Sequence, residues 1–146
     1  GIISDLSDKF LVKIEDIIDM KNEKLFLGKD RPQPGYPNGA VVCAFMACPK
    51  GNLLFKKCID QIVENTENNY YGENPLAVSG PGLVYDVLKK HNNNKLKNFN
   101  FIFDGDYYIQ NGIKVCKYKF LGKNKMIELF KHPHYHQMWK DKDIYN

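Results

Sequence analysis

The chain has 146 residues, of which 43% are apolar and 26% are charged. This balance is typical of one globular domain with a core and argues against a largely disordered chain. Its 21 basic and 17 acidic residues give a formal net charge of +4, and every basic residue except Arg31 is a lysine. Because arginine dominates the specific reading of bases, the composition argues against nucleic acid as a partner, whereas lysines near a site would favour an anion such as a nucleotide diphosphate.

The four cysteines follow no metal-binding or disulfide pattern. Cys43, Cys48, Cys58 and Cys116 form no CxxC pair, and none lies beside a histidine with zinc-finger spacing. We expect them to be buried apolar side chains in a reducing, cytoplasmic setting rather than disulfide partners. No stretch reaches the ~20 apolar residues that span a bilayer and no signal peptide is visible, so the sequence leaves the localisation unknown.

The first part of the chain predicts short strands around a loop. Residues 1–3 predict a strand that runs into acidic residues, and residues 10–18 predict a short strand or helical turn. Residues 24–28 predict a short buried strand, and the unbroken apolar run 40–47 predicts a strand buried on both faces. Three prolines and two glycines in residues 29–39 predict a loop between these strands. Loops beside a sheet commonly carry function.

Two helices and an antiparallel β segment are predicted after this loop. Asn52 is placed to cap a helix that ends between residues 65 and 69. Its predicted core face repeats at spacings of three and four, through Leu54, Phe55, Cys58, Ile59, Ile62 and Val63. A second helix is predicted from near Gly82 to residues 92–94. Alternating aromatic and apolar residues then predict antiparallel strands at 99–103, 107–109 and 113–120, separated by the turn dipeptides Asp104-Gly105 and Asn111-Gly112.

The first group of polar side chains that a core does not need is acidic. Asp5, Ser7 and Asp8 follow the opening strand, and side chains at positions i and i+2 of an extended chain share a face. Carboxylates with this spacing are suited to chelating a divalent cation. The alternative interpretation is a solvated turn after a strand.

The second group is the segment Ser79-Gly80-Pro81-Gly82-Leu83. Glycine and proline predict a tight turn into a helix whose free N–H groups could receive a hydroxyl or a phosphate. The alternative is a plain helix start, in which Ser79 lies near the cap and Pro81 sets the geometry of the first turn.

The third group lies in the tail, where His132, His134 and His136 precede Trp139. Clustered imidazoles bind metals or diphosphates, and the alternative is a histidine-rich surface tail. The sequence contains neither a Ser/His/Asp order nor an HExxH motif, so it does not support a hydrolase.

In chain order, these segments resemble glycosyltransferase family 32, whose members carry a sugar-binding DXD motif. Residues 1–7 (Gly-Ile-Ile-Ser-Asp-Leu-Ser) resemble the family's Gly-Gly-Ile-Tyr-x-Asp-x-Asp, with Ile3 at the tyrosine and Ser7 at the second aspartate. Residues 44–52 resemble its buried strand and the start of the following helix. Residues 79–83 resemble its Thr-Gly-Pro segment, and His134 with Trp139 resembles its terminal His and Trp pair. The resemblance covers nearly the whole chain.

The resemblance implies an α/β chain that is the C-terminal part of a GT-A fold, a Rossmann-like sheet that binds nucleotide sugars, with a terminal antiparallel β segment. Residues 1–146 would be a single domain that continues a missing N-terminal half of the same catalytic domain. The implied activity is that of a retaining, mannosyltransferase-like hexosyltransferase. It would move a sugar from a nucleotide-diphosphate sugar donor to a glycan or lipid acceptor. Eukaryotic relatives in this family are anchored in the Golgi membrane.

The resemblance also implies a Mn²⁺ or Mg²⁺ site. Asp5 would be the central catalytic residue and metal anchor, with help from Ser7 or Asp8, and His134 would be a further ligand of the metal or the diphosphate. A divalent ion neutralises the charge that develops on the leaving diphosphate without a proton transfer. The implied substrate-binding residues are Asp30, Asn38, Ser79, Gly80, Pro81, Gly82 and Trp139. Because Ser7 replaces an acid, the rival interpretation is a non-catalytic carbohydrate-binding or scaffold domain with a degenerate metal site.

Overall fold

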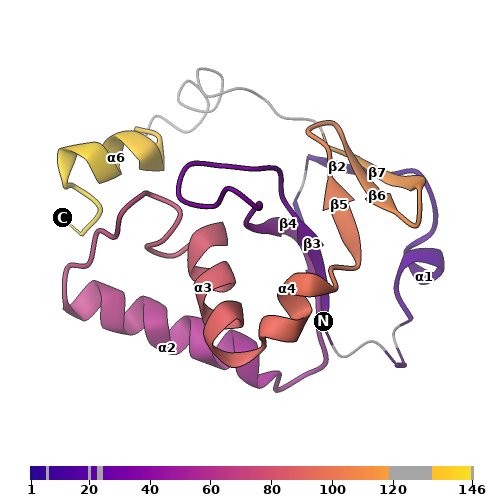
Figure 1. Cartoon of the computed structure of the whole chain (residues 1–146), viewed down its shortest axis with the longest axis horizontal. Helices are drawn as coiled ribbons and strands as arrows, with labels where there is room; N and C mark the ends of the chain where they lie inside the picture. The colour runs from indigo at the N-terminus through magenta and orange to yellow at the C-terminus, as the bar shows by residue number, and fades with distance from the viewer. Residues whose placement is uncertain (6, 20, 23–24, 119–132, 146) are drawn as a thin grey trace.

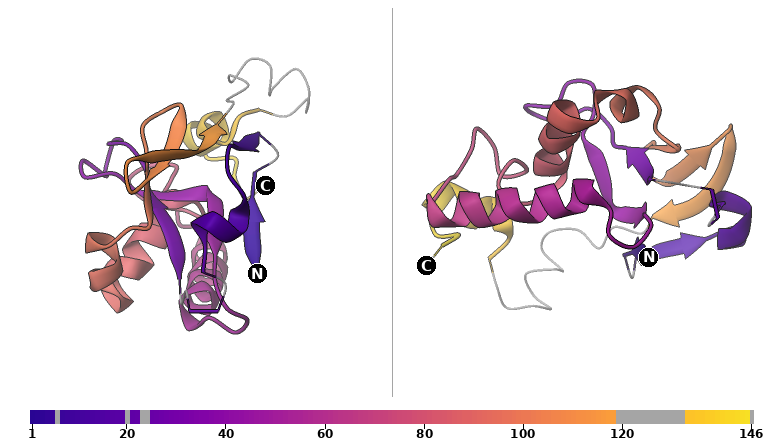
Figure 2. Two further views of the ribbon diagram at one scale, coloured as in Figure 1. Left: turned by 90° about the vertical axis from the view of Figure 1, so that its right-hand side faces the viewer. Right: turned by 90° about the horizontal axis from the view of Figure 1, so that it is seen from below.

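The computed structural model describes residues 1–5, 7–19, 21–22, 25–118 and 133–145. Their strands form one mixed sheet, and α2 and α3 gather on one side of β3 and β4 while the meander β5–β7 lies on the other (Figures 1 and 2). The strands are β1 (Ile2–Ser4), β2 (Asp8–Phe10), β3 (Phe26–Lys29), β4 (Val41–Ala47), β5 (Phe101–Phe103), β6 (Tyr107–Gln110) and β7 (Ile113–Tyr118). The helices are α1 (Ile14–Ile17), α2 (Leu53–Glu67), α3 (Pro81–His91), α4 (Asn93–Lys97) and α6 (Tyr135–Asp141). Within these ranges, no helix is long and apolar enough to cross a membrane.

The strands β1 and β2 follow each other in sequence but lie at opposite edges of the sheet. The strand order is β1-β4-β3-β5-β6-β7-β2, antiparallel throughout except for the parallel pair of β3 and β5. Only three residues separate Ser4 from Asp8, and such a link spans at most about 14 Å. The sheet must therefore curl until its edges nearly meet, and the Ser4 hydroxyl donates a hydrogen bond to Asp8 Oδ2 across the gap at 3.1 Å. We call this junction of residues 4–8 the seam.

Strand β4 carries a bulge opposite β3. Phe26 pairs with Ala47 and Gly28 with Val42, so two steps along β3 face five steps along β4. As a result, the consecutive residues Ala44 and Phe45 both pack into the interior of the curled sheet. Bulges bend a strand and redirect side chains, and they often lie next to functional sites. This bulge meets the seam, because the Asp5 N–H donates to the Ala44 carbonyl at 2.7 Å.

An aromatic layer fills the interior of the curled sheet. Phe45 lies at its centre, with the ring centroids of Phe10, Phe26, Phe101 and Tyr108 between 5.0 and 6.1 Å away. Aromatic pairs in edge-to-face and offset arrangements stabilise beyond the burial of their area. The alternation of Phe and Tyr in the predicted strands therefore reflects this layer, which packs the edge strand β2 against β3, β4, β5 and β6.

A second core lies on the other side of β3 and β4, against the helices. Leu27, Val41 and Met46 pack there against residues of α2 and α3. Asn52 Oδ1 accepts a hydrogen bond from the Leu54 N–H at 3.0 Å, which confirms the predicted cap. The bounds of α2 and α3 also agree with the predicted helices.

The predicted core face of α2 is wrong at two positions. The side chains of Ile59 and Val63 are 61% and 49% exposed. The helix packs on α3 and β4 through a stripe that includes Leu54 and Cys58 and is narrower than the apolar spacing indicated.

The predicted antiparallel segment is confirmed for β5, β6 and β7, although β5 also pairs in parallel with β3. Asp104 Oδ1 accepts hydrogen bonds from the N–H groups of Asp106 and Tyr107 and so closes the first turn. Asn111 and Gly112 adopt positive φ angles of 50° and 79° in the second turn, as two-residue hairpins require. The described chain is thus mixed α/β, and its assignment to a GT-A fold stays a prediction.

All four cysteines are free thiols, as predicted. Cys58 and Cys116 are buried, whereas Cys43 and Cys48 are half-buried. Burial raises the pKa of the Cys43 thiol to about 12, so this cysteine is a poor nucleophile at neutral pH.

Candidate functional site

A cavity of about 370 Å³ lies between the bulge of β4, the loop that follows β3, and the end of β7. Its apolar walls carry a small set of polar and aromatic side chains: Asp30, Arg31, Gln33, Phe103, Tyr108, Tyr118 and Tyr135. We call this cavity the tyrosine pocket. Concave sites with few polar groups on apolar walls are typical of small-molecule binding. The tyrosine pocket is the candidate site because two of the predicted site residues, Asp30 and Pro81, line it and a third, Asp5, adjoins it through Ala44.

Asp30 is fixed in the wall of the pocket by the loop that it begins. Its N–H donates to the Ala40 carbonyl at 3.0 Å, and this bond closes the base of the loop. Its carboxylate accepts hydrogen bonds from the Arg31 N–H at 2.8 Å and from the Gln33 amide. Burial raises the pKa of the Asp30 carboxyl, and these hydrogen bonds and the Arg31 charge oppose the rise. A rigid, half-buried carboxylate of this kind is suited to accepting hydrogen bonds from ligand hydroxyls.

Gly39 is required at the other end of this loop. It has φ +84°, and a Cβ atom there would lie 2.0 Å from the Asp30 carbonyl oxygen. The predicted loop of residues 29–39 is confirmed, with a turn closed by an isolated bridge between Gln33 and Tyr36. Asn38 lies exposed on this loop and is not among the residues that line the tyrosine pocket.

Asp8 joins the pocket to the seam. Its Oδ1 accepts a hydrogen bond from the Tyr108 hydroxyl at 3.0 Å, and its Oδ2 accepts one from the Ser4 hydroxyl at 3.1 Å. Burial raises the pKa of Asp8, and both hydrogen bonds oppose this rise. The Tyr108 pKa is also raised, first by burial and then by the Asp8 charge, so Tyr108 stays a neutral donor. Both oxygens of Asp8 are therefore engaged in holding β1, β2 and β6 together.

Asp5 and Ser7 adopt a turn and not the extended geometry that was predicted. The Ser7 N–H donates to Asp5 Oδ1 at 3.2 Å, and the Asp8 N–H donates to the Asp5 carbonyl at 3.1 Å. The prediction that their side chains share a face of a strand is wrong, because the chain must reverse here to begin β2 at the other edge of the sheet. The Asp5 carboxylate is exposed, and no donor in the described ranges engages its Oδ2.

Three carboxylates from separate segments act on one phenol in the pocket. Burial raises the pKa of Tyr118, and the charges of Asp5, Asp8 and Asp30 raise it further, whereas the Ser7 hydroxyl lowers it. These three carboxylates thus place negative potential at Tyr118, although Arg31 also lines the pocket. Such a potential favours a cation, or hydroxyl groups that donate hydrogen bonds, over a free anion.

The tail reaches the pocket through Tyr135. His134 caps α6, its Nδ1 accepting from the His136 N–H at 3.3 Å, and its ring lies 4.2 Å from that of Tyr135. Burial and then the charge of Asp30 raise the pKa of Tyr135. Trp139 has a different place, since its indole N–H donates to the Tyr71 carbonyl and so attaches α6 to the loop after α2. His132 lies outside the described residues.

The Gly-Pro-Gly segment is a packing device and not an open anion site. The N–H groups of Gly82 and Leu83 both donate to the Leu76 carbonyl, at 3.0 and 3.2 Å, so they are not free for a phosphate. A Cβ atom on Gly82 would lie 2.2 Å from the Tyr36 hydroxyl oxygen, so close packing requires glycine there. Of the four predicted residues, Pro81 lines the tyrosine pocket, whereas Ser79 and Gly80 line a separate apolar groove between β1 and α2.

The residues at and beside the tyrosine pocket suit a metal that arrives with a phosphate ligand better than a metal held by protein side chains alone. Within the described ranges, no group of three or more His, Cys, Asp or Glu side chains is arranged to hold a metal ion. Mg²⁺ is commonly bound through one or two carboxylates together with substrate phosphates and water, and Mn²⁺ favours the same oxygen ligands. The exposed Asp5 carboxylate, which adjoins the pocket, meets that lesser requirement. The structure gives no contact of Ser7 or His134 with a shared metal position.

Sequence reasoning missed the three tyrosines of the pocket. Tyr107 and Tyr108 are adjacent in a predicted strand, but which of them faces inward depends on the pairing of β6 with β5 and β7. Tyr118 and Tyr135 reach the pocket from segments far apart in the chain. The turn at Asp104-Gly105 could have indicated which tyrosine faces inward, because the position of a turn sets which residues of the next strand lie on each face of the sheet.

Comparisons of the chain with protein-family models, with curated proteins and with solved structures found no match. The function of the tyrosine pocket therefore has to be argued from its own residues and their geometry.

Proposed function

We propose that this chain is the catalytic part of a retaining, metal-assisted glycosyltransferase whose donor and acceptor sugars meet at the tyrosine pocket. The donor is a nucleotide-diphosphate sugar, and the acceptor is a hydroxyl of a glycan or lipid. One observation carries the proposal: the Asp5 N–H donates to the carbonyl of Ala44, which lines the pocket, and the Asp5 charge acts on Tyr118 in the same pocket. An exposed carboxylate thereby adjoins a pocket that already contains a fixed one.

The wall chemistry supports a sugar as the ligand. Aromatic rings offer flat apolar faces to the C–H groups of a sugar, while Asp30 and Gln33 offer hydrogen bonds to its hydroxyls. Arg31 is the single arginine of the chain and lines the same pocket, where a guanidinium suits a phosphate or carboxylate oxygen. Tyr108 and Tyr118 stay protonated at neutral pH, and because the Tyr108 hydroxyl donates to Asp8, its oxygen is left to accept a hydrogen bond from a sugar hydroxyl.

In this proposal, Asp5 would hold Mn²⁺ or Mg²⁺ together with the donor diphosphate, and His134 would contact the diphosphate or complete the metal shell. Such an ion would supply positive charge that offsets the charge of the leaving diphosphate. The acceptor oxygen bonds to the anomeric carbon as the carbon–oxygen bond to the diphosphate breaks, and the hydroxyl proton passes to the departing diphosphate. Asp30 orients the sugar through its hydroxyls, and the aromatic walls exclude water from the reacting carbon.

The test is nucleoside diphosphate binding by calorimetry with Mn²⁺ and with a chelator, together with nucleotide-sugar turnover, on the longest natural form of the chain. Asp5→Asn is expected to weaken metal-dependent binding by at least about ten-fold and to abolish turnover. Asp16→Asn is the matched control, because Asp16 is an exposed acid of α1 away from the pocket. Metal-independent binding that Asp5→Asn leaves unchanged contradicts the proposal.

The rival function is carbohydrate binding without catalysis, and the engagement of Asp8 favours it. Ser7 carries no charge, and both oxygens of Asp8 already accept hydrogen bonds, so Asp5 lacks a second acidic metal ligand in the described part of the seam. This function predicts saturable glycan binding in the presence of a chelator, weakened by Asp30→Asn, and no turnover of nucleotide sugars. The two functions thus differ in their response to removal of the metal.

A further inference from the structure

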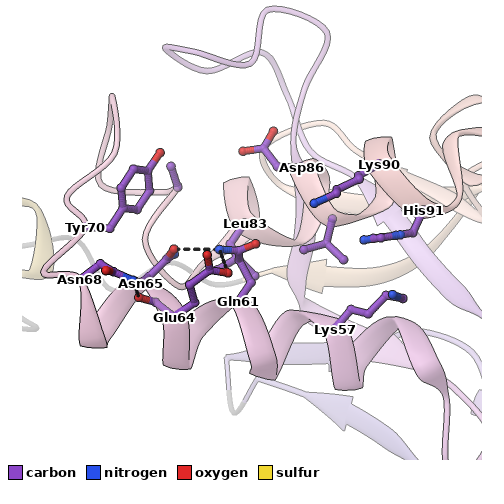
Figure 3. Close-up of a pocket in the computed structure, with 12 residues that line it drawn as sticks. Lys57, Gln61, Glu64, Asn65, Asn68, Tyr70, Leu83, Asp86, Lys90 and His91 are labelled. Atoms are coloured by element: carbon purple, nitrogen blue, oxygen red, sulfur yellow. Dashed lines mark hydrogen bonds between the residues drawn. The ribbon is translucent and has the colours of Figure 1, made fainter.

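A second groove, separate from the tyrosine pocket, runs between α2 and α3 and has a volume of about 430 Å³. Buried Leu83 and Val87 form its floor. Lys57 of α2 meets Lys90 and His91 of α3 at one end, on the right in Figure 3. We call these three residues the basic end of the α2–α3 groove.

The three residues of the basic end have no ion-pair or hydrogen-bond partner within the ranges that the structure describes. By contrast, Lys56, the residue before Lys57, forms an ion pair with Asp60 at 2.7 Å. Partial desolvation lowers the pKa of His91, and the charges of Lys57 and Lys90 lower it further. The C-terminal dipole of α3 accounts for basic residues in its last turn, but it does not account for Lys57 in the first half of α2. The repulsion at neutral pH is between Lys57 and Lys90, since the lowered pKa leaves His91 neutral, and an anion between them would relieve it and favour a proton on His91.

The rest of the groove has the opposite character. It is lined by Glu64 and Asn68 of α2, Asp86 of α3 and Tyr70 of the connecting loop, and Figure 3 shows Glu64, Asn68 and Tyr70 away from the basic end. Carboxylates there accept hydrogen bonds from hydroxyl groups and repel a second anionic group. A long polyanion is therefore a poor match, whereas a small molecule with one anionic end and several hydroxyls is a good one.

The geometry points to a binding site for a small phosphorylated sugar or polyol in the α2–α3 groove. Its phosphate lies among Lys57, Lys90 and His91, and its hydroxyls face Glu64 and Asp86 over the apolar floor. The site involves neither Asp5 nor a metal, so it is independent of the proposed transferase activity.

The experiment is an NMR titration of the His91 ring resonances in the 146-residue chain at low ionic strength, with glucose 6-phosphate, inorganic phosphate and glucose as probes. Glucose 6-phosphate is expected to give saturable shifts and to raise the pKa of His91, inorganic phosphate to bind more weakly, and glucose to have no effect at the same concentrations. Lys57→Gln and Lys90→Gln are each expected to weaken glucose 6-phosphate binding by about two- to five-fold, the range for an exposed charge pair. Lys89→Gln is the matched control, since Lys89 lies in the same last turn but does not line the groove.

Three results would each overturn the inference. Shifts that rise linearly without saturation would show a diffuse counterion effect. Equal weakening by Lys89→Gln and Lys57→Gln would show that overall charge and not the groove attracts the anion. Equal affinity for inorganic phosphate and glucose 6-phosphate would show that Glu64 and Asp86 do not bind the sugar hydroxyls. Because no nucleotide or metal is present in these titrations, their failure leaves the test of Asp5 untouched.

Discussion

The hydrogen bond from Tyr108 to Asp8 joins β6 to β2, the strand at one edge of the curled sheet. Tyr108 is 1% exposed, and its hydroxyl donates to Asp8 Oδ1 at 3.0 Å across the sheet from β6 to β2. Tyr108→Phe removes that oxygen and leaves the ring in its place among Phe45, Phe101 and Phe103. The substitution thus isolates the hydrogen bond from the packing.

The expected cost follows from the type of bond. A hydrogen bond to a charged group contributes about 1.5–3 kcal/mol, and here its loss leaves a partly buried carboxylate with the Ser4 hydroxyl alone. With an unfolding entropy of about 2 cal/mol/K per residue over 146 residues, each 1 kcal/mol corresponds to about 3 °C. Tyr108→Phe is therefore expected to lower the melting temperature by about 5–10 °C. Calorimetry and denaturant unfolding measure this change.

Tyr107→Phe is the control, because Tyr107 lies next to Tyr108 and no described residue forms a hydrogen bond with its hydroxyl. It is expected to change the free energy of unfolding by less than about 0.5 kcal/mol. A double-mutant cycle of Tyr108→Phe with Asp8→Asn should show a coupling of about 1 kcal/mol or more. Equal effects of the two phenylalanine variants, or additive effects in the cycle, would refute the role assigned to the seam.

Three further predictions test other contacts. Gly82→Ala is expected to destabilise the fold by about 1–3 kcal/mol, because the new Cβ atom would lie 2.2 Å from the Tyr36 hydroxyl oxygen. Gly80→Ala should cost far less, because the nearest atom to its Cβ would be 3.6 Å away. Denaturant unfolding compares the two variants. Asn52→Ala should cost about 1 kcal/mol through loss of the α2 cap, and a similar stability for Asn52→Ala and the parent chain would contradict the cap. The pKa of Asp30 is raised above 3.8 in the folded state, so at pH values just above 3.8 the unfolded state binds fewer protons than the folded state. The free energy of unfolding therefore falls as the pH rises through this range. Asp30→Asn should reduce this fall in unfolding curves measured from about pH 4 to 7.

Local chemistry made the helices and hairpins predictable. Asn52 caps α2, and Asp104-Gly105 and Asn111-Gly112 form the two hairpin turns, because each of these depends on residues close in sequence. The buried strand at β4 was equally visible as an apolar run. What the pattern could not reveal was the bulge at Ala44 and Phe45, since a bulge depends on the pairing partner β3.

Long-range topology decided the rest. The three-residue link from Ser4 to Asp8 looks like an ordinary turn, yet it joins the two edges of a seven-stranded sheet. Likewise, Gly82 looked like a helix start suited to an anion, and only its contact with Tyr36, 46 positions earlier, reveals a packing requirement. Residues whose roles depend on distant partners carry little local signal.

The two acids of the seam have different surroundings. Asp8 begins β2 with its side chain toward the interior, and both of its oxygens accept hydrogen bonds from the protein. Asp5 precedes the turn, is exposed, and has only Oδ1 engaged by the Ser7 N–H. Spacing alone treats the two carboxylates as equivalent, whereas their contacts make Asp8 a structural residue. The transferase proposal consequently depends on Asp5, and the serine at position 7 weakens it less than the motif indicates, because a metal that carries a diphosphate needs only one or two protein carboxylates.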